Sequence, residues 1–310
     1  MNLTLLAGGV GGGRMADGFA QQIGEALSVI VNVGDDFQLH GLSICPDLDS
    51  VTYTLAGISN VEQGWGLAGE TYRSQEMLGR LGQSDWFRLG DQDLAVHILR
   101  TKWLREGQTL TQVTRGLRQS LGIRAEILPM SDSPVSTFVE TGEGLLPFQD
   151  YFVKRQHRDK VHSFEFRGIE NAPPTREVEQ ALRGADAVVL APSNPFVSLA
   201  PILAVTGVRP ILTDFAGPRV AVSPIIGGHA LKGPAGQMMT DMGLECSVLG
   251  IARHYQGLLD GLVIDAQDAA HEEELRGAGL KVLCTDTIMR DRPGRGRLAG
   301  VILDWMKLVF

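Results

Sequence analysis

Four aspartates lie close together near the start of the chain, where they could bind a metal ion. Asp35 and Asp36 end an apolar run, and Asp47 and Asp49 follow shortly after it. Carboxylate oxygens are the ligands that Mg²⁺ prefers, and a bound divalent cation assists phosphoryl chemistry. Such a cation would also screen the repulsion between two neighbouring carboxylates. We predict that Asp35 and Asp49 share a divalent metal ion and are catalytic residues.

Asp47 has an equally good structural interpretation. Pro46 at the first position of a helix would make Cys45 its cap and would place Asp47 in the first turn. Acidic residues are common in that turn because they complement the helix dipole. Both interpretations therefore stay open for Asp47.

Glycines fill most of the segment Gly8–Gly13, which directly follows an apolar run. A strand that leads through a glycine-rich turn into a helix presents backbone N–H groups to a phosphate. The turn is not a Walker A motif, and it matches the dinucleotide fingerprint only loosely. A tight turn that binds nothing would need one or two glycines. We therefore expect a ligand to approach the backbone here, with Gly9, Gly11 and Gly12 at its phosphates.

Two loops in the second half of the chain carry short polar groups after apolar runs. One loop contains Ser193 and Asn194, and the other runs from Ser223 to Gly227. In open α/β sheets such loops lie at the carboxyl ends of strands, where ligands bind. Each turn alone would mean little, but with the glycine turn they indicate one nucleotide diphosphate site. We predict that Ser193, Asn194, Ser223 and Gly227 contact the nucleotide.

A further group of polar residues surrounds the start of an expected helix near position 91. Asp91 fits an N-terminal cap, and His97 fits a buried histidine whose hydrogen bonds are satisfied within the core. Asp93 and Arg100 share this segment. Arg88 precedes the helix and is the better functional candidate.

Apolar runs that alternate with amphipathic segments predict a doubly wound α/β fold with a mostly parallel sheet. Several runs are apolar throughout, as is typical of strands covered on both faces. Thr109 and Gln112 fit a capping box at the start of a helix. The expected strands are Leu3–Ala7, Ser28–Val33, Ala125–Leu128, Ala187–Ala191, Pro210–Thr213, Val220–Ser223, Gly261–Asp265 and Lys281–Cys284.

The chain of 310 residues is expected to form a single domain with two additions to its sheet. Residues 37–124 lack conventional strands and predict a mostly helical insert. Residues 151–171 are rich in charged and aromatic side chains and predict an exposed arm.

Composition excludes several classes of partner. The formal net charge is −8 and no basic block is present, which argues against nucleic acid or an anionic membrane surface. The three cysteines have no metal-site spacing, and the chain shows neither a signal peptide nor a long apolar run. We expect a cytoplasmic protein that binds small molecules.

The motifs together resemble the 2-phospholactate transferase (CofD) family, which makes the deazaflavin coenzyme F-420. The resemblance runs through nearly the whole chain. The segments that carry it are Leu6–Gly12, Asn32–Asp36, His40–Leu42, Ile44–Asp49, Leu89–Ala95, Pro129–Asp132, Ala191–Pro195 and Ser223–Gly227.

The resemblance implies a Rossmann-like core, a magnesium ion, commonly a homodimer, and a phosphotransferase that acts on substituted phosphate groups. The expected reaction moves 2-phospholactate or phosphoenolpyruvate from a guanosine diphosphate-linked donor to 7,8-didemethyl-8-hydroxy-5-deazariboflavin, with release of GMP. By motif match, the deazaflavin contacts fall on Asp49 and Arg88.

Two other functions are compatible with parts of the sequence. A nucleotide-sugar-binding regulatory protein could use the same core, but such relatives carry a different loop where this chain has Gly34–Gln38. A nicotinamide oxidoreductase is disfavoured because the glycine spacing does not fit the dinucleotide fingerprint, although Asp35 lies near the expected acidic position.

Overall fold

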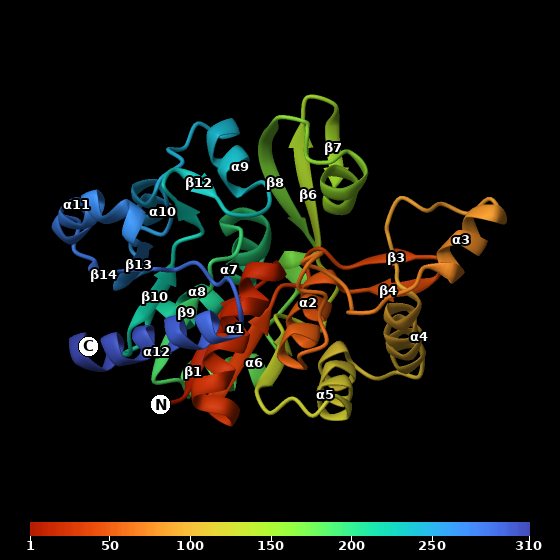
Figure 1. Ribbon diagram of the computed structural model, residues 1–310, viewed down its shortest axis with the longest axis horizontal. Coiled ribbons are helices and arrows are strands. Elements are labelled where there is room, and N and C mark those ends of the chain that lie inside the picture. Colours follow the sequence, from red (N-terminus) through yellow and green to blue (C-terminus); the bar gives the residue numbers. More distant parts are fainter.

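A seven-stranded parallel sheet forms the centre of the computed structural model, which describes residues 1–310 (Figure 1). Its strand order is β14-β13-β10-β9-β1-β2-β5. The strands are β1 (Leu3–Ala7), β2 (Leu27–Val31), β5 (Glu126–Pro129), β9 (Ala187–Leu190), β10 (Arg219–Val222), β13 (Gly261–Asp265) and β14 (Lys281–Thr285).

The sheet is doubly wound, which confirms the predicted fold class. From β1 the chain first builds outward through β2 and β5, and then returns to place β9 on the other side of β1. The topological switch point therefore lies between β1 and β9, and ligands of such sheets bind beyond the carboxyl ends of the strands at this point. Every residue of β1, β9 and β13 is buried, as expected of strands covered on both faces.

Helices cover the sheet in groups. The helix α1 (Gly9–Ile23) lies between α2 (Pro46–Leu55) and α12 (Arg292–Val309), so the first and last helices of the chain are neighbours (Figure 1). A second group consists of α6 (Arg176–Arg183), α7 (Ala200–Ala204) and α8 (Val208–Thr213). The remaining helices near the sheet are α9 (Ala235–Asp241), α10 (Val248–His254) and α11 (Glu272–Gly277).

Two parts of the chain project from this core (Figure 1). One holds the hairpin of β3 (Phe37–Leu39) and β4 (Leu42–Ile44) with α3 (Arg73–Arg80) and α4 (Asp91–Arg105), whereas α5 (Leu110–Ser120) packs on β5 at the edge of the central sheet. The other is an antiparallel sheet of β6 (Ser136–Thr141), β7 (Gly144–Pro147) and β8 (Val161–Arg167). A short hairpin follows β10 and consists of two strands of two residues each, β11 (Ile225–Ile226) and β12 (His229–Ala230).

The structure refines the expected insert and arm. Residues 37–124 begin with a hairpin and only half of them are helical, and α2 packs on α1 and the sheet rather than in the projection. The expected arm, 151–171, contains β8, which pairs with β6 and so forms one edge of the small antiparallel sheet.

One expected strand is wrong. Residues Pro210–Thr213 belong to helix α8, whose buried side chains include Ile211 and Leu212. A short apolar run has no period that separates a buried helix turn from a strand, and the packing of α8 on α6 and α7 decides the matter. The capping box of Thr109 and Gln112 is confirmed at the start of α5. None of the helices is both long and apolar enough to cross a membrane.

Candidate active site

The loops after β1 and β9 are fastened together at the switch point by one buried hydroxyl. Ser193 Oγ donates to the Gly8 carbonyl at 2.7 Å and accepts from the Gly8 N–H at 3.2 Å. Both groups are buried. The sequence predicted that these two loops share one site, and the structure does bring them into contact.

The glycine segment is not the open loop that we expected. Gly8 is the cap of α1, and Gly9–Gly13 form its first turns. A Cβ on Gly11 would lie 2.5 Å from the Pro192 carbonyl oxygen, and one on Gly12 would lie 2.9 Å from Ser193 Oγ. Packing of α1 against the chain itself therefore accounts for these glycines. Their contact with a phosphate stays a prediction.

Asp47 lies in the first turn of α2 behind the cap Cys45, as the structural interpretation predicted, and its side chain caps α1. Its Oδ1 accepts the Gly9 N–H at 2.7 Å, and its Oδ2 accepts a 3.0 Å hydrogen bond from Asn32 Nδ2. The same Asn32 amide also donates to Asp35 Oδ1. Asn32 was not among the predicted site residues, although a lone amide between Val31 and Val33 was a usable signal.

This first network holds carboxylates in a protein interior. Burial raises the pKa of Asp35 well above its usual range, and the neighbouring charges of Asp47 and Asp36 raise it further. Burial likewise raises the pKa of Asp47 to about 6, against the opposing effect of its hydrogen bonds from Asn32 and Gly9. The folded chain therefore disfavours the fully ionised state of this cluster.

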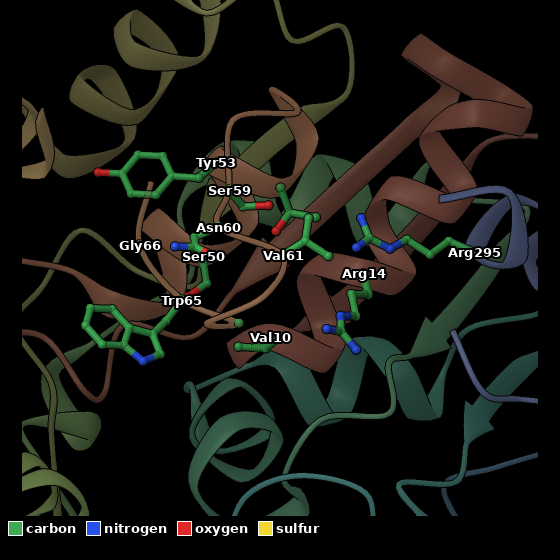
Figure 2. A pocket seen from close by; sticks show the side chains of 12 residues that line it. Val10, Arg14, Ser50, Tyr53, Ser59, Asn60, Val61, Trp65, Gly66 and Arg295 are labelled. Carbon is green, nitrogen blue, oxygen red and sulfur yellow. The ribbon is translucent and has the colours of Figure 1, made fainter. Parts of the chain in front are cut away.

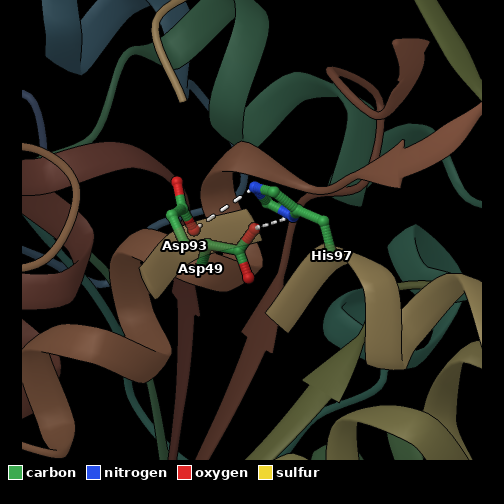
Figure 3. A group of neighbouring side chains, drawn as sticks. All are labelled: Asp49, Asp93 and His97. Atoms are coloured by element: carbon green, nitrogen blue, oxygen red, sulfur yellow. Dashed lines mark ion pairs between the residues drawn. The ribbon is translucent and has the colours of Figure 1, made fainter. Parts of the chain in front are cut away.

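Asp49 belongs to a second buried network, which α4 completes. Arg100 donates to both oxygens of Asp49, with Nη1 at 3.1 Å from Oδ2. His97 lies between two acids, with Nδ1 3.7 Å from Asp49 Oδ2 and Nε2 3.2 Å from Asp93 Oδ1 (Figure 3). The Tyr53 hydroxyl donates to Asp93 Oδ1 at 2.5 Å. Asp49 is thus held in a fixed orientation.

Asp36 is affected by charged residues of both networks. Burial raises its pKa well above the usual range; Arg100 opposes the increase, whereas Asp49 and Asp47 add to it. Its Oδ1 is buried and has no hydrogen-bond partner. The structure therefore places Asp35 and Asp49 in adjoining networks, with Asp36 as the carboxylate that has an oxygen to spare.

The carboxylates of Asp35 and Asp36 fit a hard divalent cation. Such an ion would stabilise their ionised forms, which burial disfavours, and it would bind the Asp36 oxygen that has no hydrogen-bond partner. Ligand atoms of Asp49, Asp93 and His97 also lie within 4.8 Å of one another. The Arg100 guanidinium already occupies both oxygens of Asp49, so its positive charge opposes a cation in that second group.

Arg88 forms a cation–π contact with Tyr72. Its side chain is exposed, and its guanidinium carbon lies 4.0 Å from the centroid of the Tyr72 ring. Asp91 caps α3 by accepting the N–H groups of Arg73 and Ser74 at 3.1 and 3.0 Å. The cap expected at Asp91 therefore serves α3 and not α4.

The other predicted nucleotide contacts are hydrogen-bonded within the chain. Asn194 Oδ1 accepts the Phe196 N–H at 2.9 Å and caps the next helical turn. Ser223 Oγ bonds to the backbone of Ile225. The Gly227 N–H donates to the Asp268 carboxylate at 3.0 Å. These groups shape the loops, and direct contact with a nucleotide remains a prediction for them.

Comparison with known proteins gives a family for this arrangement. The model of the family described as 2-phospho-L-lactate transferase CofD matches residues 3–290. A phosphoenolpyruvate transferase of Streptomyces griseus is 41% identical and aligns over 98% of each chain. A 2-phospho-L-lactate transferase of Methanosarcina acetivorans is 37% identical over 97% of this chain and 98% of its own.

The same fold occurs in a more distant solved structure. A UPF0052 family protein of Bacillus halodurans superposes with a TM-score of 0.66 over 97% of this chain and 98% of its own. Its sequence identity is 17%, so this likeness concerns the fold alone.

Proposed function

This chain belongs to the CofD family of 2-phospho-L-lactate transferases. We propose that it catalyses the transfer of a phosphorylated three-carbon acid in coenzyme F-420 synthesis. Relatives that align over the whole chain are named transferases, so the protein is an enzyme of that kind. The proposed donor is a three-carbon acid, lactate or enolpyruvate, linked through its oxygen to guanosine diphosphate, so that it consists of 2-phospholactate or phosphoenolpyruvate joined to GMP. The proposed acceptor is the ribityl hydroxyl of 7,8-didemethyl-8-hydroxy-5-deazariboflavin.

In this reaction the acceptor oxygen attacks the phosphorus that carries the three-carbon acid. The bond from this phosphorus to the oxygen bridging it to GMP breaks, GMP leaves, and the hydroxyl proton is released. The product is coenzyme F-420-0 or its dehydro form. The two adjoining carboxylate networks near the switch point carry the proposal, because the predicted catalytic residue Asp35 lies in the first and Asp49 lies in the second.

Asp49 is the proposed catalytic residue that receives the acceptor. Because Arg100 holds both of its oxygens, its orientation is set before the substrate arrives. It can accept a hydrogen bond from the attacking hydroxyl and align its oxygen with the phosphorus. Phosphoryl transfers depend strongly on such positioning.

The proposed metal ion is Mg²⁺, held by Asp35 and by the unpartnered Oδ1 of Asp36. Asp49, the other predicted ligand, pairs through both oxygens with Arg100, whose positive charge opposes a cation at that side chain. When bound, the ion would neutralise charge on the diphosphate. The N-terminus of α1 lies beside this group and also favours negative charge.

The decisive experiment is mass spectrometry of a reaction that contains the deazaflavin, the guanylated acid and Mg²⁺. Joint appearance of the phosphodiester product and GMP supports the transferase. Asp49→Asn should reduce turnover by at least 100-fold, whereas Asp304→Asn, at an exposed site on α12, should leave it unchanged. Binding of a nucleotide sugar with no product would instead support the regulatory alternative.

The proposal also includes the quaternary state and location. The enzyme acts as a homodimer in the cytoplasm. Light scattering during gel filtration tests the dimer, and cell fractionation tests the location.

A further inference from the structure

A small cavity lies beside α1, between α2, the loop that follows α2, and α12 (Figure 2). Its inner volume is about 20 Å³ and it is partly open to solvent, so oxygens of a bound group could enter it while the rest of the molecule stays outside. Cationic and neutral side chains line it, with no acidic residue among them. The lining residues are Val10, Arg14, Ser50, Tyr53, Thr54, Ser59, Asn60, Val61, Gly64, Trp65, Gly66 and Arg295.

Arg14 is a half-buried cation with no acidic partner. It forms no ion pair or side-chain hydrogen bond, and burial together with the nearby charge of Arg295 lowers its pKa. Removing a guanidinium from water is unfavourable unless another group compensates its charge. Figure 2 shows its side chain at the cavity, on the same side as that of Arg295.

Arg295 brings a second guanidinium from the other end of the chain. Its Nη1 lies 3.2 Å from Asp17 Oδ2, and the same carboxylate also pairs with Arg292. The Nε of Arg295 is buried and has no hydrogen-bond partner. A third cation lies at the rim, because a Cβ on Gly64 would come within 2.8 Å of Lys232 Nζ. The cavity therefore has an excess of positive charge.

Neutral donors complete the lining. Ser50 and Thr54 present hydroxyl groups from α2, and Asn60 adds an amide from the following loop. Guanidinium groups bind carboxylates and phosphates through paired hydrogen bonds, and hydroxyl and amide groups can satisfy the remaining oxygen lone pairs. We infer that this cavity binds the oxyanion group, a carboxylate or a phosphate, of a small molecule.

The Tyr53 side chain lies between the cavity and the proposed active site. Tyr53 lines the cavity, and its hydroxyl donates to Asp93, which faces His97 and so the Asp49 network. An oxyanion bound beside Arg14 would thus be separated from this network by the Tyr53 side chain. If the proposed function holds, the natural source of the oxyanion is the carboxylate of the three-carbon acid on the donor. A free anion such as inorganic phosphate has the same chemistry.

Calorimetric titration of the intact protein separates these sources. The probes are inorganic phosphate, L-lactate and phosphoenolpyruvate, each added to the wild type, Arg14→Gln, Arg14→Lys and Arg124→Gln. Arg124 is a suitable control because it is largely exposed, pairs with Glu25 and does not line the cavity. We expect at least one probe to bind, Arg14→Gln to weaken it at least tenfold, Arg14→Lys to restore part of the loss, and Arg124→Gln to stay within twofold.

The identity of the bound probe reports the source. Binding of lactate and phosphoenolpyruvate without phosphate assigns a carboxylate, whereas binding of phosphate assigns a site that also takes free anions. Absence of binding by all three probes, or equal binding by Arg14→Gln, would overturn the inference. If the transferase assay gives no product but Arg14-dependent binding persists, the proposed function fails and the cavity assignment stands.

Discussion

Arg100 of α4 and Asp49 of α2 form an ion pair in which both side chains are almost fully buried. Removing one partner would leave the other charged and without compensation. We expect Arg100→Met to lower the free energy of unfolding by about 3–5 kcal/mol and to abolish turnover. Urea denaturation and the transferase assay measure the two effects.

The matched control for this prediction lies on the same helix. Lys102 pairs with Glu106 across 3.8 Å, and both side chains are more than half exposed. Lys102→Met should change stability by less than about 1 kcal/mol. A similar small effect for Arg100→Met would mean that the buried pair does not hold Asp49.

Stability should depend on pH and on Mg²⁺ through the raised pKa of Asp47, about 6. A carboxyl group whose pKa is higher in the folded chain binds its proton more tightly there than in the unfolded chain. Its contribution is therefore fully present below the ordinary pKa of about 4 and is lost as the pH rises through 6. The loss is on the order of 3 kcal/mol for such a shift, and Asp35 and Asp36 act in the same direction.

The measurement is urea denaturation of the metal-free protein at pH 5 and pH 8, repeated with Mg²⁺. We expect lower stability at pH 8, with much of the loss restored by the ion because it stabilises the ionised carboxylates. Asp47→Asn should flatten the pH dependence. A free energy of unfolding that rises from pH 5 to pH 8 would contradict the assignment.

Two glycines in helices should respond to alanine in opposite ways. A Cβ on Gly11 of α1 would lie 2.5 Å from the Pro192 carbonyl oxygen, so Gly11→Ala must separate the loops after β1 and β9 and lower the melting temperature. Gly79 of α3 has no atom within 4 Å of such a Cβ. Gly79→Ala should stabilise the chain by about 0.5–1 kcal/mol, since alanine favours helices. Calorimetry of both variants checks the contrast.

Removal of the Ser193 hydroxyl should loosen the switch point. Ser193→Ala deprives the buried Gly8 N–H and carbonyl of their partner, and we expect a loss of about 1–3 kcal/mol. Ser120→Ala, at an exposed position near the end of α5, should have a much smaller effect. Chemical denaturation of both variants compares them. Equal effects would show that the fastening adds no stability.

The central sheet was predictable because its strands are mainly apolar, with polar residues chiefly at their ends. Its strand boundaries fall within two residues of those expected for β1, β2, β5, β9, β10, β13 and β14. The small antiparallel sheet was harder to predict. In β6 the inward positions are Thr137, Val139 and Thr141, and the two buried threonines hide the alternation of polar and apolar residues.

The carboxylate cluster was predictable in composition but not in pairing. Sequence spacing could join Asp35 to Asp49, but the packing of α2 on α1 directs Asp47 to Gly9 and Asn32 instead. The helix α4 then brings Arg100 to Asp49 across 51 positions of sequence. Contacts between such distant segments follow from tertiary packing, which local sequence patterns do not reveal.

The last helix supplies part of a cavity whose other walls come from the first 66 residues. Gly18 of α1 and the backbone of Arg295 meet so closely that a Cβ on Gly18 would lie 2.5 Å from the Arg295 carbonyl oxygen. A nascent or truncated chain that ends before α12 could assemble the aspartates of the first two helices, yet it would lack the second arginine. The two-arginine cavity is therefore complete only after α12 has been synthesised.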